Sequence, residues 1–257
     1  MSNQTTDNNK RIAKNTIFLY FRTILILLIN LYMSRVILDN LGVTDYGVYN
    51  AVGGVIAMFS VVSGALSSSI SRFITFELGR GNSERLHTIF STSVTIQLFI
   101  ALLVVLLSEP IGIWFLNTHM NIPADRLIAA NWVLQCSLAA FCINLIAVPY
   151  NASIIAHERM SAFAYISVLE AALKLLVAFM LPILLFDKLI VYAVLLVGVA
   201  LIIRAAYGIY CKRNFQECRY QFIYDKKLLK EMTGFAGWNF LTNTASVSYT
   251  HLRAHET

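Results

Sequence analysis

The chain has 257 residues, of which 58% are hydrophobic and only 13% are charged. Because soluble domains carry about 25% charged residues, this composition excludes an ordinary soluble protein and favours a chain buried in lipid. The net charge of +6 does not indicate a nucleic-acid partner, since most basic residues lie at the ends of apolar segments, where anionic lipid head groups attract them.

Six apolar segments follow one another along the chain, each near the roughly 20 residues that a helix needs to cross the hydrocarbon core. They lie at 16–38, 47–71, 89–107, 127–149, 163–186 and 189–210. Backbone polar groups in lipid must be satisfied within the segment, so all six are predicted to be helices. The expected fold class is an all-α polytopic membrane protein, with a six-helix transmembrane bundle over residues 15–210.

The connections between these segments alternate between rich and poor in Lys and Arg. One set holds Lys10, Arg11, Lys14, Arg72, Arg80, Arg85, Arg159, Lys212, Arg213, Arg219, Lys226, Lys227 and Lys230, and the other holds Arg35, Arg126 and Lys188. By the positive-inside rule the first set faces the cytoplasm. The N-terminal segment 1–14 is therefore predicted to be cytoplasmic.

The first segment contains a cation well inside its apolar run. Arg22 lies about two turns into the helix, and Asn30 lies roughly 80° around the axis on the same broad face. A buried charge is costly in lipid, so it should face the bundle interior or water. Two interpretations stay open: Arg22 meets an anionic group such as a phosphate, or it snorkels to the head groups.

The second segment has a face of small residues. At helical spacing it carries Gly53, Ala57, Ser60, Gly64, Ser67 and Ser71. Small residues let two helices pack closely, and this is the favoured interpretation. The alternative is that the serines line a polar groove.

The third and fourth segments are expected to flank an outer loop that contains Pro110 and Pro123, and the fourth helix to end at Pro149. Asn144 on the fourth helix can hydrogen-bond sugar hydroxyls, although bonding between helices is favoured. On the fifth helix Glu170 and Lys174 are four residues apart and can pair on one face. A structural ion pair is favoured over a site that couples transport to a proton or cation.

The C-terminal part is predicted to contain a cytoplasmic basic loop over 211–232, in which Asp225 caps a short basic helix. Residues 233–247 read as the opening of a seventh span. They are too few to cross about 30 Å at 1.5 Å per residue. Residues 248–257 are polar and are expected to be a non-native tail.

Nothing in the sequence supports catalysis. It has no nucleophile elbow, P-loop or H-E-x-x-H motif, and its cysteines are not at zinc-ligand spacing. We therefore expect no enzyme activity, no cofactor and no metal.

Several connected strings carry a family resemblance. They are RxxLxxLGVTDYGVYNAVGG at 35–54, LSSSISRFITFELGRG at 66–81, WFLNTHMNIPADRLIAANW at 114–132, VPYNASIIAHERMSAFAYIS at 148–167 and FAGWNF at 235–240. In these strings the chain resembles bacterial polysaccharide or lipopolysaccharide (O-antigen-type) flippases of the multidrug/oligosaccharidyl-lipid/polysaccharide exporter superfamily.

The resemblance implies two pseudo-symmetric six-helix bundles around a central cavity, of which this chain is the N-terminal one. It implies a multi-pass protein of the bacterial inner membrane that flips polyprenyl-diphosphate-linked oligosaccharides to the periplasmic leaflet by alternating access. The implied partners are the lipid-linked oligosaccharide, membrane lipids, H⁺ or Na⁺ as coupling ion, and the missing C-terminal bundle. By their position in the bundle, the cavity candidates are Arg22, Asn30, Arg35, Arg72, Asn144, Glu170 and Lys174.

Two other functions remain open. A multidrug or cation antiporter of the same superfamily would favour an acidic, aromatic cavity, whereas the charges inside the spans here are mainly basic. A membrane enzyme of the same polysaccharide pathway typically presents a large outer loop, and the outer loops here are short.

Overall fold

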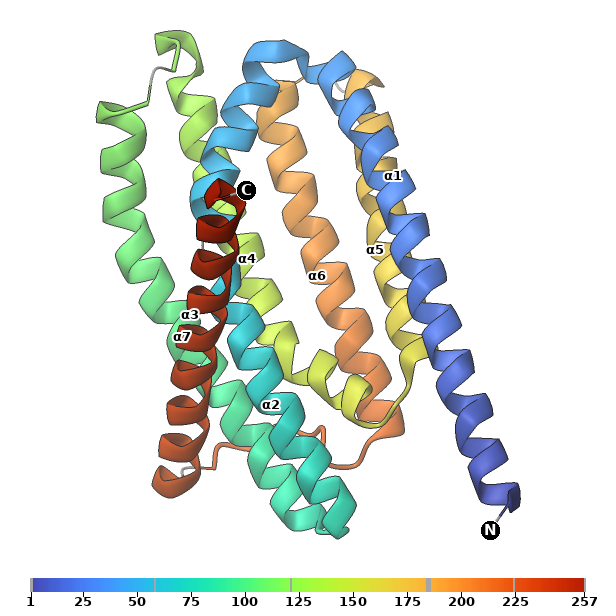
Figure 1. Cartoon of the computed structure of the whole chain (residues 1–257). Helices are drawn as coiled ribbons and strands as arrows, with labels where there is room; N and C mark the ends of the chain where they lie inside the picture. The colour runs from blue at the N-terminus through green and yellow to red at the C-terminus, as the bar shows by residue number, and fades with distance from the viewer. Residues whose placement is uncertain (1, 58, 121, 184–185, 224, 257) are drawn as a thin grey trace.

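The computed structural model describes residues 2–57, 59–120, 122–183, 186–223 and 225–256. These residues form α-helices and short 3₁₀-helices and no strand, which confirms the predicted all-α fold (Figure 1). In chain order the elements are α1 (Ser2–Ala57), α2 (Ser60–Arg80), α3 (Ser83–Thr118), η1 (Ala124–Arg126), α4 (Leu127–Ala156), α5 (Met160–Met180), η2 (Leu181–Ile183), α6 (Lys188–Asn214) and α7 (Lys226–Glu256).

Helix α1 reverses direction at Gly42. This residue has φ 78° and ψ 169°, outside the helical region, and glycine reaches a positive φ without the clash that a Cβ causes. In Figure 1 the part before Gly42 rises along one side of the bundle, and the part after it descends toward α2. The outer loop suggested by residues 41–47 is therefore a turn at one glycine.

The second predicted span is divided between the end of α1 and the start of α2. The amide of Phe59 donates to the carbonyl of Ile56 at 3.0 Å in the turn between them. The segment predicted as one helix is therefore two helices. A Cβ at Gly53 or Gly64 would meet no atom within 4 Å, so these glycines do not bring two helices into close contact.

Five helical stretches of the described residues are long and apolar enough to cross a membrane. They are Asn15–Ile56, Ser83–Thr118, Ala124–Ala156, Met160–Ile183 and Lys188–Asn214. The first stretch includes the reversal at Gly42, so it holds one pass and the start of the next, which α2 completes. The helices thus cross the bundle in the order that the sequence predicted.

Both helix ends predicted at prolines are wrong. Pro110 lies inside α3, which continues to Thr118, and Pro149 lies inside α4, which continues to Ala156. Membrane helices tolerate proline because neighbouring groups satisfy the backbone that it frees. The outer loop between α3 and α4 is correspondingly short.

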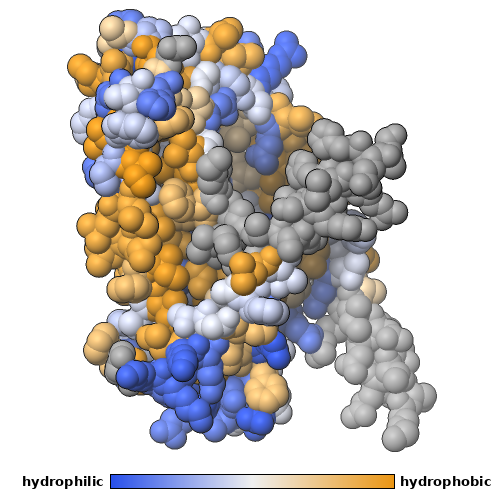
Figure 2. All heavy atoms as spheres, turned by 60° about the vertical axis from the view of Figure 1, so that its left-hand side comes forward, coloured by the Kyte–Doolittle hydropathy of each residue, from blue (hydrophilic) through white to orange (hydrophobic). Residues whose placement is uncertain are grey.

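An apolar band crosses the middle of one face of the bundle (Figure 2). Figure 2 shows hydrophobic side chains across the centre of one face and hydrophilic side chains at its two ends. On α3 the side chains of Phe99, Leu102 and Leu106 are each more than half exposed. Contiguous exposed apolar surface of this kind marks contact with lipid or a partner, and together with the apolar helices it makes the chain a multi-pass membrane protein.

The basic and less basic connections lie at opposite ends of the bundle. The connections between α2 and α3, α4 and α5, and α6 and α7 lie at the lower end in Figure 1, which we call the basic end. The reversal at Gly42, the α3–α4 connection and the start of α6 lie at the other end, which we call the opposite end.

The basic segment KKLLKEM is not a separate short helix, because it forms the first turns of α7. Asp225 Oδ1 accepts from the amides of Lys227 and Leu228, both at 3.0 Å, which confirms the predicted cap. Helix α7 packs on α2, where the hydroxyl of Ser69 donates to the carbonyl of Met232 at 3.3 Å. Helix α7 continues through the segment expected to be a tail, whose origin stays a prediction.

Candidate functional site

A cavity of about 330 Å³ lies among α1, α4, α5 and α6. Its apolar walls include Met33 and Phe141. Its polar lining includes Tyr49, Ser137, Asn144, Glu170, Lys174 and Tyr192. Three of the residues proposed from the sequence (Asn144, Glu170 and Lys174) therefore line the same cavity.

The Glu170–Lys174 pair is the charged centre of this cavity. Lys174 Nζ donates to Glu170 Oε1 at 2.6 Å, which confirms the pairing predicted from their spacing on α5. The two side chains are 37% and 32% exposed, so both remain open to the cavity. Charges in a membrane interior face water or one another, and this pair does both, since its two members contact each other and remain partly exposed to the cavity.

Two tyrosines form an aromatic part of the same wall. The rings of Tyr49 and Tyr192 meet edge to face with centroids 5.0 Å apart. Sequence reasoning missed both residues, although a tyrosine within an apolar span is a signal, because its hydroxyl requires a polar partner when buried. The cavity thus combines aromatic rings, an amide and a charge pair.

A second recess, of about 400 Å³, lies along one face of α1. It is lined by Arg22, Thr23, Ile26, Leu27, Asn30, Leu31 and Ser34. The predicted common face of Arg22 and Asn30 is therefore confirmed. Polar and apolar side chains alternate along this recess, which suits an amphipathic ligand.

Arg22 is held in place without an acidic partner among the described residues. Its guanidinium carbon lies 4.2 Å from the centroid of the Phe163 ring, a cation–π contact. Its Nε is buried and has no hydrogen-bond partner in the described structure. A buried donor without an acceptor is costly, so the site favours a ligand that brings acceptor oxygens.

Arg35 and Arg72 do not belong to either recess. Arg35 lies toward the opposite end, 82% exposed, and its Nε is 4.0 Å from Asp39 Oδ2. The Arg72 guanidinium carbon lies 4.3 Å from the Phe235 ring centroid, between α2 and α7. Their place in a cavity shared with a second bundle stays a prediction.

Arg204 on α6 is a further membrane-embedded cation that sequence reasoning did not select. Its guanidinium carbon lies 3.9 Å from the centroid of the Tyr150 ring on α4. The signal was present, since Arg204 interrupts a long apolar run eight residues before Lys212.

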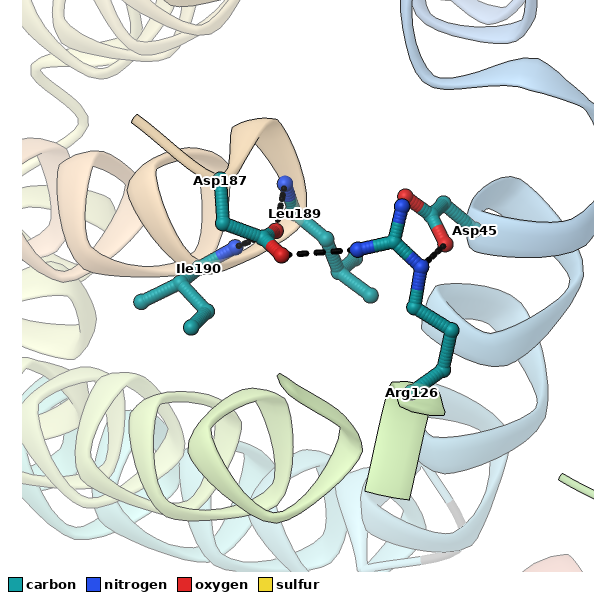
Figure 3. Close-up of polar contacts among 5 residues, drawn as sticks. All are labelled: Asp45, Arg126, Asp187, Leu189 and Ile190. Carbon is teal, nitrogen blue, oxygen red and sulfur yellow. Dashed lines mark hydrogen bonds and ion pairs between the residues drawn. The ribbon is translucent and has the colours of Figure 1, made fainter. Parts of the chain in front are cut away.

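A three-residue ion cluster, the outer clamp, joins elements at the opposite end of the bundle (Figure 3). It consists of Arg126 between Asp45 and Asp187, with Nε 3.1 Å from Asp45 Oδ1 and Nη1 2.7 Å from Asp187 Oδ2. Asp187 also caps α6 by accepting from the amides of Leu189 and Ile190. Arg126 lies in the α3–α4 connection, Asp45 follows the reversal in α1, and Asp187 precedes α6. The clamp therefore holds these three parts of the chain together.

The chain shares its fold with part of several solved membrane transporters. No known protein-family profile matches it. It superimposes with a TM-score of 0.74 and 18% identity on an outward-facing multidrug resistance MATE family transporter of the MOP superfamily, over 95% of this chain and 55% of that one. The TM-score, identity and coverage are the same for a MOP superfamily transporter from Pyrococcus furiosus Vc1. The reverse polarity of that protein's binding pocket suggests that its function is different.

A curated relative is also a membrane protein. The chain is 26% identical over 148 residues to the uncharacterized membrane protein EpsK of Bacillus subtilis (strain 168). The aligned residues cover 58% of this chain and 29% of EpsK. The chain thus spans about half the length of the similar transporters and under a third of EpsK. The likeness to these transporters is one of fold.

Proposed function

We propose that this chain forms one half of the pathway of a flippase that moves a polyprenyl-diphosphate-linked oligosaccharide across the bacterial inner membrane. The other half comes from a C-terminal helix bundle, and alternating access exposes the space between them to each side in turn. The basic end faces the cytoplasm in this proposal, as the positive-inside rule requires.

The α1 recess is the observation that carries this proposal. The guanidinium of Arg22 has an unsatisfied buried Nε, and guanidinium groups bind phosphate oxygens through paired, charge-assisted hydrogen bonds. Asn30 and Ser34 offer partners for sugar hydroxyls, while Ile26 and Leu31 offer apolar surface. A diphosphate that joins a sugar to a lipid needs these three kinds of contact together.

The Glu170–Lys174 pair supports a coupling role in the same cycle. A proton or cation that neutralises Glu170 would release Lys174 from its 2.6 Å contact, and the free ammonium could then attract an anionic cargo. Coupling of this kind requires that the pair remain reachable from water, which its partial exposure allows.

A multidrug antiporter is the second candidate, and a specific feature favours it. Tyr49, Phe141 and Tyr192 surround a carboxylate, Glu170, in one cavity, and aromatic rings with a carboxylate suit a cationic amphiphile. The charge balance of the Glu170–Lys174 pair distinguishes the two functions. Glu170 is neutralised by Lys174, so the cavity offers a cationic drug no free negative charge.

The test uses the full-length protein that contains this chain, expressed in a strain that lacks its own flippase. Arg22→Ala should lower surface polysaccharide by about tenfold, since a charge-assisted hydrogen bond contributes roughly 1.5–3 kcal/mol. Arg35→Ala is the matched control, because that side chain is exposed at the surface. Unchanged polysaccharide at normal expression would remove Arg22 from the mechanism, and Glu170-dependent drug resistance would favour the antiporter.

A further inference from the structure

A third recess lies at the basic end, separate from the cavity and from the α1 recess. Its volume is about 600 Å³. Its lining residues are Tyr150, Gly208, Lys212, Cys218, Arg219 and Tyr220. Two of these side chains are cationic and none is a carboxylate, so the recess favours an anion.

The loop that forms one wall of this recess is fixed to α3. His87 Nε2 lies 2.7 Å from the carbonyl of Arg219, and the hydroxyl of Tyr220 lies 3.4 Å from Thr95 Oγ1. The amide of Gln221 donates to the hydroxyl of Ser91 at 3.3 Å. Because the Arg219 carbonyl and the Gln221 amide are both held, little ordering of the backbone is needed when the Arg219 side chain meets a ligand.

Arg204 adds a third cation at the inner side of the recess. Its guanidinium stacks on Tyr150, and Arg204 Nη1 lies 3.0 Å from the position that a Cβ on Gly208 would take. Arg204 precedes Lys212 by two turns of α6, about 12 Å along the helix axis. The cations therefore extend from the end of the helix toward hydrocarbon depth.

The same length of α6 also exposes apolar side chains. Leu201, Ile202 and Ile209 are each more than half exposed. Exposed aliphatic side chains at this depth lie where acyl chains begin, whereas Lys212 and Arg219 lie where head groups begin. A ligand that satisfies both parts has a phosphate at one end and acyl chains at the other.

We propose that this recess binds the phosphate head group of an anionic phospholipid in the leaflet at the basic end. Lys212 and Arg219 contact the phosphate, and the acyl chains follow α6 past Ile209 toward Leu201. Basic pockets between membrane helices recognise anionic lipids in this way. The proposal is independent of the cargo, because none of its residues lines the cavity or the α1 recess.

The test is lipid binding to the purified full-length protein in neutral detergent, followed by native mass spectrometry. Phosphatidylglycerol is titrated against phosphatidylcholine, and inorganic diphosphate is titrated alone. The double variant Lys212→Gln/Arg219→Gln should weaken phosphatidylglycerol binding by about twenty-five-fold, because each cation near the surface contributes about fivefold. Both side chains are exposed, so the variant should keep its thermal unfolding temperature in lipid-free detergent.

The matched control is Lys227→Gln/Lys230→Gln, which removes the same charge from exposed positions on α7. It should leave phosphatidylglycerol binding nearly unchanged. Equal losses in the two double variants would show diffuse attraction to the basic end and overturn the site. Binding of inorganic diphosphate without retention of phosphatidylglycerol would also overturn it, because a water-soluble phosphate compound would then be the occupant.

Discussion

The guanidinium of Arg126 lies 2.7 Å from the carboxylate of Asp187, and this contact ties the α3–α4 connection to the first turn of α6. The same guanidinium pairs with Asp45, which is only 5% exposed. A single side chain thus holds two helix starts, and one of its partners is cut off from water. The stability of the opposite end should depend on it.

Arg126→Ala should destabilise the protein by about 2 kcal/mol. Removal of one partner of a buried pair leaves the other charge uncompensated, at a cost of about 3–5 kcal/mol. That figure is reduced here because the Arg126 side chain is 34% exposed and partly screened. The measurement is thermal unfolding of the full-length protein in detergent.

The control for this change is Arg35→Ala, which breaks an exposed pair at 4.0 Å and should cost under about 1 kcal/mol. Asp45→Asn in the Arg126→Ala background should restore part of the loss, because the uncompensated charge is gone. If Arg126→Ala and Arg35→Ala unfolded at the same temperature, Asp45 would not be a buried charge that requires its partner.

Glu170→Gln should reduce transport strongly while it changes the unfolding temperature little. The pair faces the cavity and is about one-third exposed, so its contribution to stability is of the order of a surface pair, about 0.5 kcal/mol. Its proposed contribution to function is different, since it controls whether Lys174 is free. Transport and thermal unfolding of the same preparation separate the two effects.

The double variant Glu170→Gln/Lys174→Gln removes both charges and provides the control. It should fold like the parent protein and still fail to transport. With amides at both positions, a coupling ion has no carboxylate to neutralise and no ammonium is released. Normal transport by the double variant would mean that the pair is only structural, as the sequence alone favoured.

Local features of the structure could be predicted from the sequence, whereas features set by distant contacts could not. The pairing of Glu170 with Lys174 follows from their spacing on one helix, and the cap at Asp225 follows from its place before a helical run. The outer clamp joins residues that are far apart in sequence, and no local pattern indicates such a partner.

The errors at prolines and glycines have a common physical origin. Pro110 and Pro149 were expected to end helices, because proline removes a backbone donor. Packing within the bundle keeps both helices continuous. Gly42 supplies the reversal instead, since only its backbone adopts the positive φ there.

Gly53→Leu should block transport without loss of stability. Gly53 lines the cavity, and a Cβ at this position would meet no atom within 4 Å. The added side chain therefore fills space that a ligand or water needs. Its effect on the fold is small, because replacement of a helical glycine also gains up to about 1 kcal/mol of helix propensity. Transport and unfolding temperature are again measured together.

Gly112→Leu is the matched substitution, at a position outside the cavity. A Cβ on Gly112 would lie 3.1 Å from a methyl group of Leu134, where α3 packs on α4. Overpacking of such a contact costs about 1–3 kcal/mol, so this variant should unfold at a lower temperature. If Gly53→Leu lost stability as Gly112→Leu does, the cavity would be a packed interface and not a ligand space.

His157 should make the basic end more stable at mildly acidic pH than at alkaline pH. Its Nε2 lies 3.0 Å from Glu217 Oε1 and its Nδ1 lies 2.9 Å from the carbonyl of Ser153, so the protonated ring can donate from both nitrogens. Burial opposes the charge, but these hydrogen bonds outweigh it and raise the pKa of His157 above its usual value. Burial also opposes the charge of Glu217, yet the bond from His157 holds the pKa of that carboxyl below its usual value.

The signs of the two shifts define a pH window. Stability from a raised histidine pKa is fully present below the unfolded value of 6.5 and is lost as pH rises through the folded pKa. Stability from a lowered glutamate pKa is present above the unfolded value of 4.5 and is lost as pH falls through the folded pKa. The pair therefore contributes most between these two unfolded values. His157→Gln should lower the unfolding temperature clearly at pH 5.5 and much less at pH 9. An equal loss at both pH values would mean that the ring of His157 stabilises the turn only by stacking on Phe215.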